Sequence, residues 1–196
     1  ELRKLKILIT KQLSAVSIVL DTRDNPHLVF ESLNAKGKPL SQSDLIRNYF
    51  MMKISVTEQQ RMFDMYWRPM QEGLGEELSE FVRHYLMKRG TEVRKNEVYF
   101  IVKESVENQD PVAYLTDLFT FSNYYKILIN PNLEQDHRVY RLLKRLNRLE
   151  VSTAYPFLLN CFHAVAEGRL QTSDLVDILT TVENYLVRRF VCGYPT

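Results

Sequence analysis

A run of basic side chains between positions 138 and 148 is the sequence feature best suited to bind a charged ligand. Arg138, Arg141, Arg145 and Arg148 follow one another at steps of three and four, and Lys144 stands beside them. On an α-helix this spacing places the side chains on one face, where they could neutralise phosphates of a nucleic-acid backbone. A solvated outer face of an amphipathic helix has the same pattern. We therefore regard these five residues as candidate nucleic-acid contacts, with a solvated face as the alternative.

Residues that usually build catalytic or metal sites do not group in the sequence. The four histidines are scattered, without HExxH or Cys-pair spacing, which disfavours a metal site: His27, His84, His137 and His163. Phosphate-loop, dinucleotide and nucleophile-elbow motifs do not occur. Acidic residues such as Asp64 and Glu80 have basic neighbours, and we interpret them as solvated. We expect no complete catalytic site and no cofactor in this chain.

The composition indicates a folded segment of a cytoplasmic protein. A chain of 196 residues with 45% hydrophobic content can bury a substantial core. Its 26 basic and 24 acidic residues leave a net charge of +2, so any nucleic-acid surface must be local. Cys161 and Cys192 form no disulfide framework, which favours the reducing cytoplasm, and Cys161 lies on an apolar stripe typical of a core. No apolar run of about 20 residues occurs, so we predict no membrane contact.

The basic residues and most of the chain are predicted to be helical. Apolar residues at helical spacing recur through the chain beyond residue 55. Ser41, Thr57 and Asp110 are predicted N-caps, and Pro111 suits the first helical position. Asn130 before a proline should end that helix. Behind the basic residues runs an apolar stripe of Val139, Leu142, Leu143, Leu146 and Leu149. Short connections favour an irregular multi-helix bundle.

The N-terminal part is predicted to differ from the rest. Residues 2–12 predict a short amphipathic helix, and Val16, Ile18 and Leu20 alternate as in a strand. A lone strand cannot satisfy its own backbone, so it would pair with a sheet outside this chain. Since the sequence begins at Glu1 rather than Met, we expect a segment of a longer protein. The expected fold class is mainly α, with one short N-terminal strand.

Residues 29–48 carry a specific resemblance. They read VFESLNAKGKPLSQSDLIRN, which resembles the signature FExLNxxGxxLxxxDLIxN of the GmrSD-type modification-dependent restriction endonucleases, whose N-terminal part is called domain of unknown function 262. Tyr66-Trp67, the segment 80–86 and the closing segment 183–193 also agree. The resemblance therefore covers most of the chain.

The resemblance implies a parent protein of three parts. A ParB-type N-terminal domain with a DGQxR motif handles nucleotide, a helical region follows, and a C-terminal His-Me finger nuclease cuts DNA. This chain has neither catalytic motif. It resembles the helical middle, with residues 1–55 as the end of the N-terminal domain and 56–196 as a helical domain. The implied parent uses a nucleoside triphosphate and a divalent metal, and the implied partners are its missing domains and DNA.

Phe30, Asn34 and Gly37 are the positions that the resemblance assigns to the nucleotide site. An Asn amide offers both a donor and an acceptor, and Gly permits close backbone approach. Equally, Phe30 would serve as a core anchor, Asn34 as a helix C-cap and Gly37 as a turn residue. Both interpretations stay open at this point.

Three functions follow from these observations. The first is a helical connecting region of a DNA restriction or phage-defence protein, whose parent would be a nucleotide-dependent endonuclease although this segment alone is not catalytic. The second is a nucleic-acid-binding module that uses the basic residues. The third is a protein-interaction bundle. An independent hydrolase has the least support, because no acid, base or metal constellation is visible.

Overall fold

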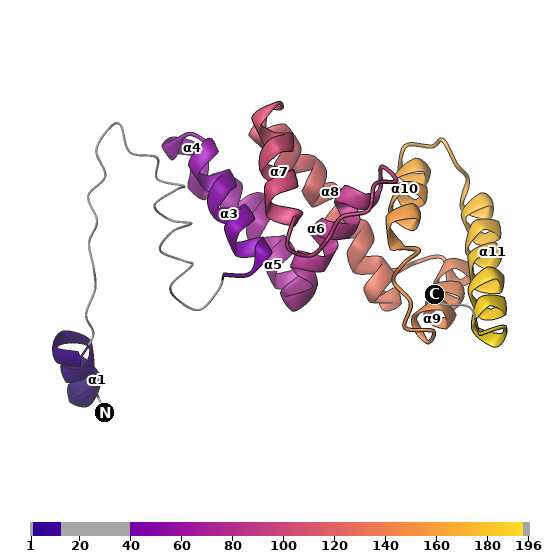
Figure 1. The fold of residues 1–196 in the computed structure, drawn as a ribbon, viewed down its shortest axis with the longest axis horizontal. Helices are drawn as coiled ribbons and strands as arrows, with labels where there is room; N and C mark the ends of the chain where they lie inside the picture. The colour runs from indigo at the N-terminus through magenta and orange to yellow at the C-terminus, as the bar shows by residue number, and fades with distance from the viewer. Residues whose placement is uncertain (1, 13–39, 194–196) are drawn as a thin grey trace. The chain divides into compact units, whose positions relative to one another are not determined.

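The computed structural model describes residues 2–12 and 40–193 of the chain. These residues are mainly helical and contain no strand, which confirms the predicted mainly α class (Figure 1). The strand predicted around Val16–Leu20 lies outside the described residues. The chain divides into two compact units, Glu1–Pro39 and Leu40–Thr196.

The first unit contributes one short helical segment to the described residues. Helix α1 (Leu2–Ile7) continues as a π-helical turn, η1 (Leu8–Gln12). The Thr10 hydroxyl donates to the Lys6 carbonyl at 2.7 Å. The amphipathic helix predicted over residues 2–12 is therefore present.

The second unit is a bundle of helices joined by short connections. In order these are α3 (Gln42–Lys53), α4 (Val56–Met62), η2 (Phe63–Trp67), α5 (Arg68–Leu74), η3 (Gly75–Glu77), α6 (Leu78–Met87), α7 (Val98–Glu107), α8 (Pro111–Ile129), η4 (Pro131–Leu133), α9 (His137–Asn147), α10 (Tyr155–Ala166) and α11 (Thr172–Val191). Helix α3 packs against α6, α7 and α8, so it belongs with the later helices here. The boundary predicted after residue 55 concerns the parent protein and stays a prediction.

Two of the three predicted N-caps, Ser41 and Asp110, are confirmed. The Ser41 hydroxyl accepts from the Asp44 backbone N–H at 3.1 Å, and the Asp110 carboxylate accepts from two backbone N–H groups of α8 at 3.3 and 3.0 Å. The prediction for Thr57 is wrong, because α4 begins at Val56 and Ser55 stands before it. The backbone carbonyl of Ser55 already accepts from Gln59 N–H at 3.0 Å, which places Thr57 inside the first turn.

Helix α8 is the centre of the core. It contacts α3, α5, α6, α7, α9 and α10, and buries side chains on more than one face because neighbours surround it: Tyr114, Leu115, Leu118, Phe121, Ser122, Tyr125 and Leu128. Trp67 and Phe50 pack beside each other with ring centroids 6.4 Å apart, both almost fully buried. This core carries α9, α10 and α11 at one end of the second unit (Figure 1).

Candidate functional site

Helix α9 carries four of the five basic residues, and the fifth, Arg148, is its C-cap residue and keeps a helical backbone conformation. Local chemistry explains where the helix begins and which face it buries. The Asp136 carboxylate caps it by accepting from Arg138 N–H at 2.8 Å and Val139 N–H at 3.3 Å. Its apolar stripe is buried against α11, η4 and α8: Val139, Leu142, Leu143 and Leu146. No acidic residue occurs in its sequence, HRVYRLLKRLN. The exposed side of α9 is therefore positively charged.

Two of the five candidate contacts already have partners. The Arg138 guanidinium lies 2.9 Å from the Asp136 carboxylate and, with the backbone bonds of the cap, holds the pKa of that carboxyl far below its usual range. Arg145 makes a two-bond ion pair with Glu183 of α11, with N–O distances of 2.6 and 2.8 Å. Arg138 thus belongs to the cap and Arg145 to the packing of α9 on α11.

The other three cations, Arg141, Lys144 and Arg148, are exposed and form no ion pair with any described residue. We call them the α9 basic face. The Lys144 ammonium donates to the Tyr140 hydroxyl at 3.0 Å and lies 5.4 Å from that ring centroid, so its charge is not neutralised. At 3.6 residues per turn the three residues fall within an arc of about 60° and span about 10 Å along the axis. One DNA strand carries a phosphate about every 3.4 Å of helix axis, so the spacing suits about three phosphates.

The residues assigned from the resemblance are mostly outside the described part. Phe30, Asn34 and Gly37 lie outside the described residues, and their contribution to a nucleotide site stays a prediction. The end of the signature forms the start of α3. There the Ser41 hydroxyl donates to the Asp44 carboxylate at 2.6 Å, and Arg47 lies 3.3 Å from the same side chain. This end of the signature thus has a capping role.

A polar cluster inside α6 was not predicted. Arg83 binds the Glu80 carboxylate through Nε at 3.0 Å, and its NH2 group lies 3.2 Å from Nε2 of His84. Nδ1 of His84 lies 3.1 Å from the Tyr125 hydroxyl. Glu80, which we expected to be solvated, is thus held within this cluster. Its spacing to Arg83 and His84, three and four residues, was the available signal.

The His84 ring is 1% exposed, and its burial lowers its pKa from 6.5 to about 4. Arg83 can only donate to Nε2, so the ring proton sits on Nδ1 and is donated to Tyr125. Neutral His84 therefore links α6 to α8 and has a structural role.

The described residues were also compared with the requirements of a metal site, a membrane-spanning helix and a reactive cysteine. Within residues 2–12 and 40–193, no group of three or more His, Cys, Asp or Glu side chains could hold a metal ion. In the same ranges, no helix is both long enough and apolar enough to cross a bilayer. Cys161 is 5% exposed, which confirms its predicted place in the core, and burial raises the pKa of its thiol.

Comparison with known proteins gave no matching family model, no matching curated protein and no matching solved structure. The resemblance to the GmrSD-type restriction endonucleases therefore stays a prediction.

Proposed function

We propose that this chain is a helical region of a DNA restriction or phage-defence protein, where it connects a nucleotide-handling domain to a nuclease and contacts the DNA backbone through α9. The connecting role rests on the resemblance of residues 29–48. The DNA contact rests on one observation, the three cations of the α9 basic face that lack carboxylate partners among the described residues.

The division of α9 cations into paired and unpaired groups decides which of them would bind phosphate. A cation held by a carboxylate must lose that partner before it can bind another anion, whereas an exposed cation only displaces water and counterions. Arg145 and Arg138 are in the first group. Three phosphate contacts by the second group would make log K fall with log salt at a slope of about −2.7. Such contacts position a protein on DNA without reading its sequence.

A protein contact is the second candidate function, and the end of α11 favours it. Large apolar side chains are exposed in its last turns: Tyr185 at 56%, Val187 at 40%, Phe190 at 75% and Val191 at 77%. A neighbouring domain of the parent protein would be one partner for such a surface. This candidate predicts no dependence of DNA affinity on the α9 basic face.

The test measures fluorescence anisotropy of labelled double-stranded DNA with the wild type and Arg141→Glu/Arg148→Glu across a salt series. Arg145 is left unchanged because its reversal would break the ion pair with Glu183 and disturb α9 itself. The matched control is Arg61→Glu/Lys95→Glu, since both residues are exposed and form no ion pair with a described residue.

We expect the α9 variant to lose at least tenfold in affinity at low salt, with the control close to wild type. Equal losses of DNA affinity in both double variants would mean that affinity depends on the net charge of the chain and not on the α9 basic face. An unchanged affinity in the α9 variant would leave the protein-contact function.

A further inference from the structure

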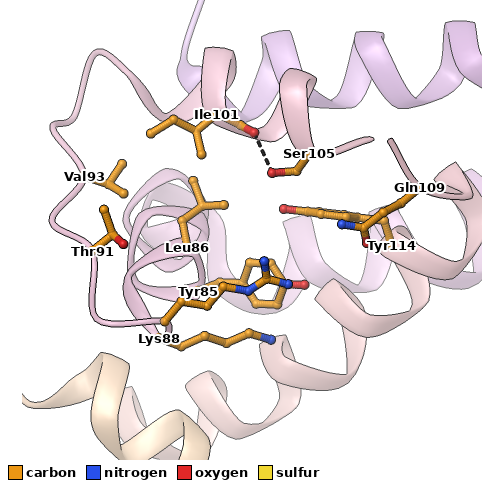
Figure 2. A pocket seen from close by; sticks show the side chains of 10 residues that line it. Tyr85, Leu86, Lys88, Thr91, Val93, Ile101, Ser105, Gln109 and Tyr114 are labelled. Carbon is orange, nitrogen blue, oxygen red and sulfur yellow. Dashed lines mark hydrogen bonds between the residues drawn. The ribbon is translucent and has the colours of Figure 1, made fainter. Parts of the chain in front are cut away.

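A pocket remote from α9 lies between α6, α7, the beginning of α8 and the connection after α6 (Figure 2). Its cavity measures about 180 Å³ and is lined by Tyr85, Leu86, Lys88, Arg89, Thr91, Val93, Ile101, Ser105, Gln109 and Tyr114. A cavity of about 150 Å³ is enough for benzene. The pocket therefore has the size of a single-ring molecule.

One wall of the pocket is held by an ion pair between Lys88, which is mostly buried, and Asp117, whose side chain is 45% exposed. The Tyr85 hydroxyl donates to the Asp117 carboxylate at 2.5 Å, and the Lys88 ammonium binds the same oxygen at 3.2 Å. That ammonium also lies 3.9 Å from the Tyr85 ring centroid and 3.4 Å from that of Phe121. These contacts neutralise Lys88 and lock the Tyr85 ring, so this wall exists before any ligand arrives.

Two hydroxyl groups face the interior from opposite helices. Figure 2 shows the oxygen ends of Ser105, on α7, and Tyr114, on α8, pointing toward each other across the pocket. Ser105 donates its hydroxyl proton to the Ile101 carbonyl at 2.8 Å, so its oxygen is left as an acceptor on the pocket wall. Tyr114 is 6% exposed. As a lining residue, Tyr114 can donate its hydroxyl proton to an acceptor atom placed in the cavity.

Both charged residues that line the pocket, Lys88 and Arg89, are basic, and Lys88 is paired with Asp117. Arg89 is exposed and forms no ion pair with a described residue, and no Asp or Glu lines the pocket. Burial lowers the pKa of Lys88 and raises the pKa of Tyr114, and the positive charge of Arg89 makes a smaller contribution that lowers both pKa values. An arginine fork matches a carboxylate in shape and charge. The rest of the lining, including Leu86, Val93 and Ile101, is apolar.

We propose that this pocket binds a small organic monocarboxylate with an apolar body of about one ring. The carboxylate would be held by Arg89 and the Tyr114 hydroxyl, while the apolar body would pack against Leu86, Val93 and Ile101. Such a site would make the helical unit responsive to a small molecule, independently of DNA contact by α9.

The test uses benzoate as the probe, with benzamide as its neutral isostere and acetate as a carboxylate without a ring. Ligand-observed NMR measures the binding of each to the whole chain. We expect benzoate to bind at millimolar concentration or below, and benzamide and acetate to bind at least tenfold more weakly.

Arg89→Gln should weaken benzoate at least tenfold and leave benzamide unchanged, because only the carboxylate uses the guanidinium. Lys95→Gln, an exposed cation outside the pocket lining, is the matched control and should bind as the wild type does. Thr91→Trp, at an exposed lining position, should fill the cavity and remove binding of all three probes.

No benzoate binding by the folded wild type would overturn the proposal. Equal binding of benzoate and benzamide, or undiminished binding by Arg89→Gln or Thr91→Trp, would do the same. Near-ultraviolet circular dichroism of each variant shows that the loss of binding is not a loss of fold.

Discussion

Buried His84 should make the stability of this chain depend on pH in a predictable direction. Its pKa is 6.5 when solvated and about 4 in the folded chain. Between these values the unfolded chain binds a proton that the folded chain does not, so stability must fall as the pH falls. The loss begins near pH 6.5 and is complete below about pH 4. For these two pKa values, linkage gives a loss of about 2 kcal/mol between pH 7 and pH 5.

The groups that face His84 explain why protonation is unfavourable. Its ring is enclosed by Tyr125 from α8 and Tyr155 from α10, with ring centroids 5.8 Å away in both cases. Arg83 points a donor at Nε2. Glu80 Oε1, at 3.6 Å, favours the charged ring, but burial has the larger effect on the pKa.

Urea unfolding at several pH values, followed by the fluorescence of Trp67, measures this effect. Trp67 is the single tryptophan and is 1% exposed. We compare the wild type with His84→Gln, which cannot titrate. The wild type should lose about 2 kcal/mol more than the variant between pH 7 and pH 5. Equal losses of stability in the wild type and the variant, or an NMR-titrated pKa of His84 above 6, would show that His84 is not held neutral by burial.

Three further predictions test the packing of the second unit. Asp110→Ala should cost about 1 kcal/mol in urea unfolding, because it removes the acceptor of two α8 backbone N–H groups. Leu179 is 0% exposed, so Leu179→Ala should lower the free energy of unfolding by about 2–5 kcal/mol, as is typical of a core truncation. The control Thr180→Ala, on the exposed side of the helix, should change it by less than about 0.5 kcal/mol. Of the two thiols, only exposed Cys192 should react quickly with a thiol reagent in the native chain, and Cys161 should react after denaturation; equal native rates would contradict its burial.

Sequence periodicity predicted the local features of this fold well. The leucine stripe of α9 is buried as expected because an apolar face at helical spacing needs a partner surface. Asp110 followed by proline identified the start of α8 because both residues act within the first turn. Thr57 was wrongly chosen as a cap because Ser55, two residues earlier, offers an equally suitable start, and sequence alone does not rank them.

Features that depend on tertiary contacts could not be predicted. The partner of Arg145, Glu183, lies 38 residues away, so the sequence did not show which arginines of α9 are free. The pocket likewise joins Tyr85, Ser105 and Tyr114 from three helices, and no short motif links them. The periodic pattern predicted five cations on one helix face. The structure shows that Arg138 and Arg145 are paired with carboxylates, whereas the three cations of the α9 basic face are not paired with a described residue.

Photo-crosslinking tests the contact between α9 and DNA most directly. A photoreactive amino acid is placed at position 141 on α9, and in a control chain at position 61 on α4, both exposed positions. After irradiation with bound double-stranded DNA, we expect a crosslink from position 141 that disappears at high salt, and little crosslinking from position 61. Crosslinking from position 61 without any from position 141 would contradict it.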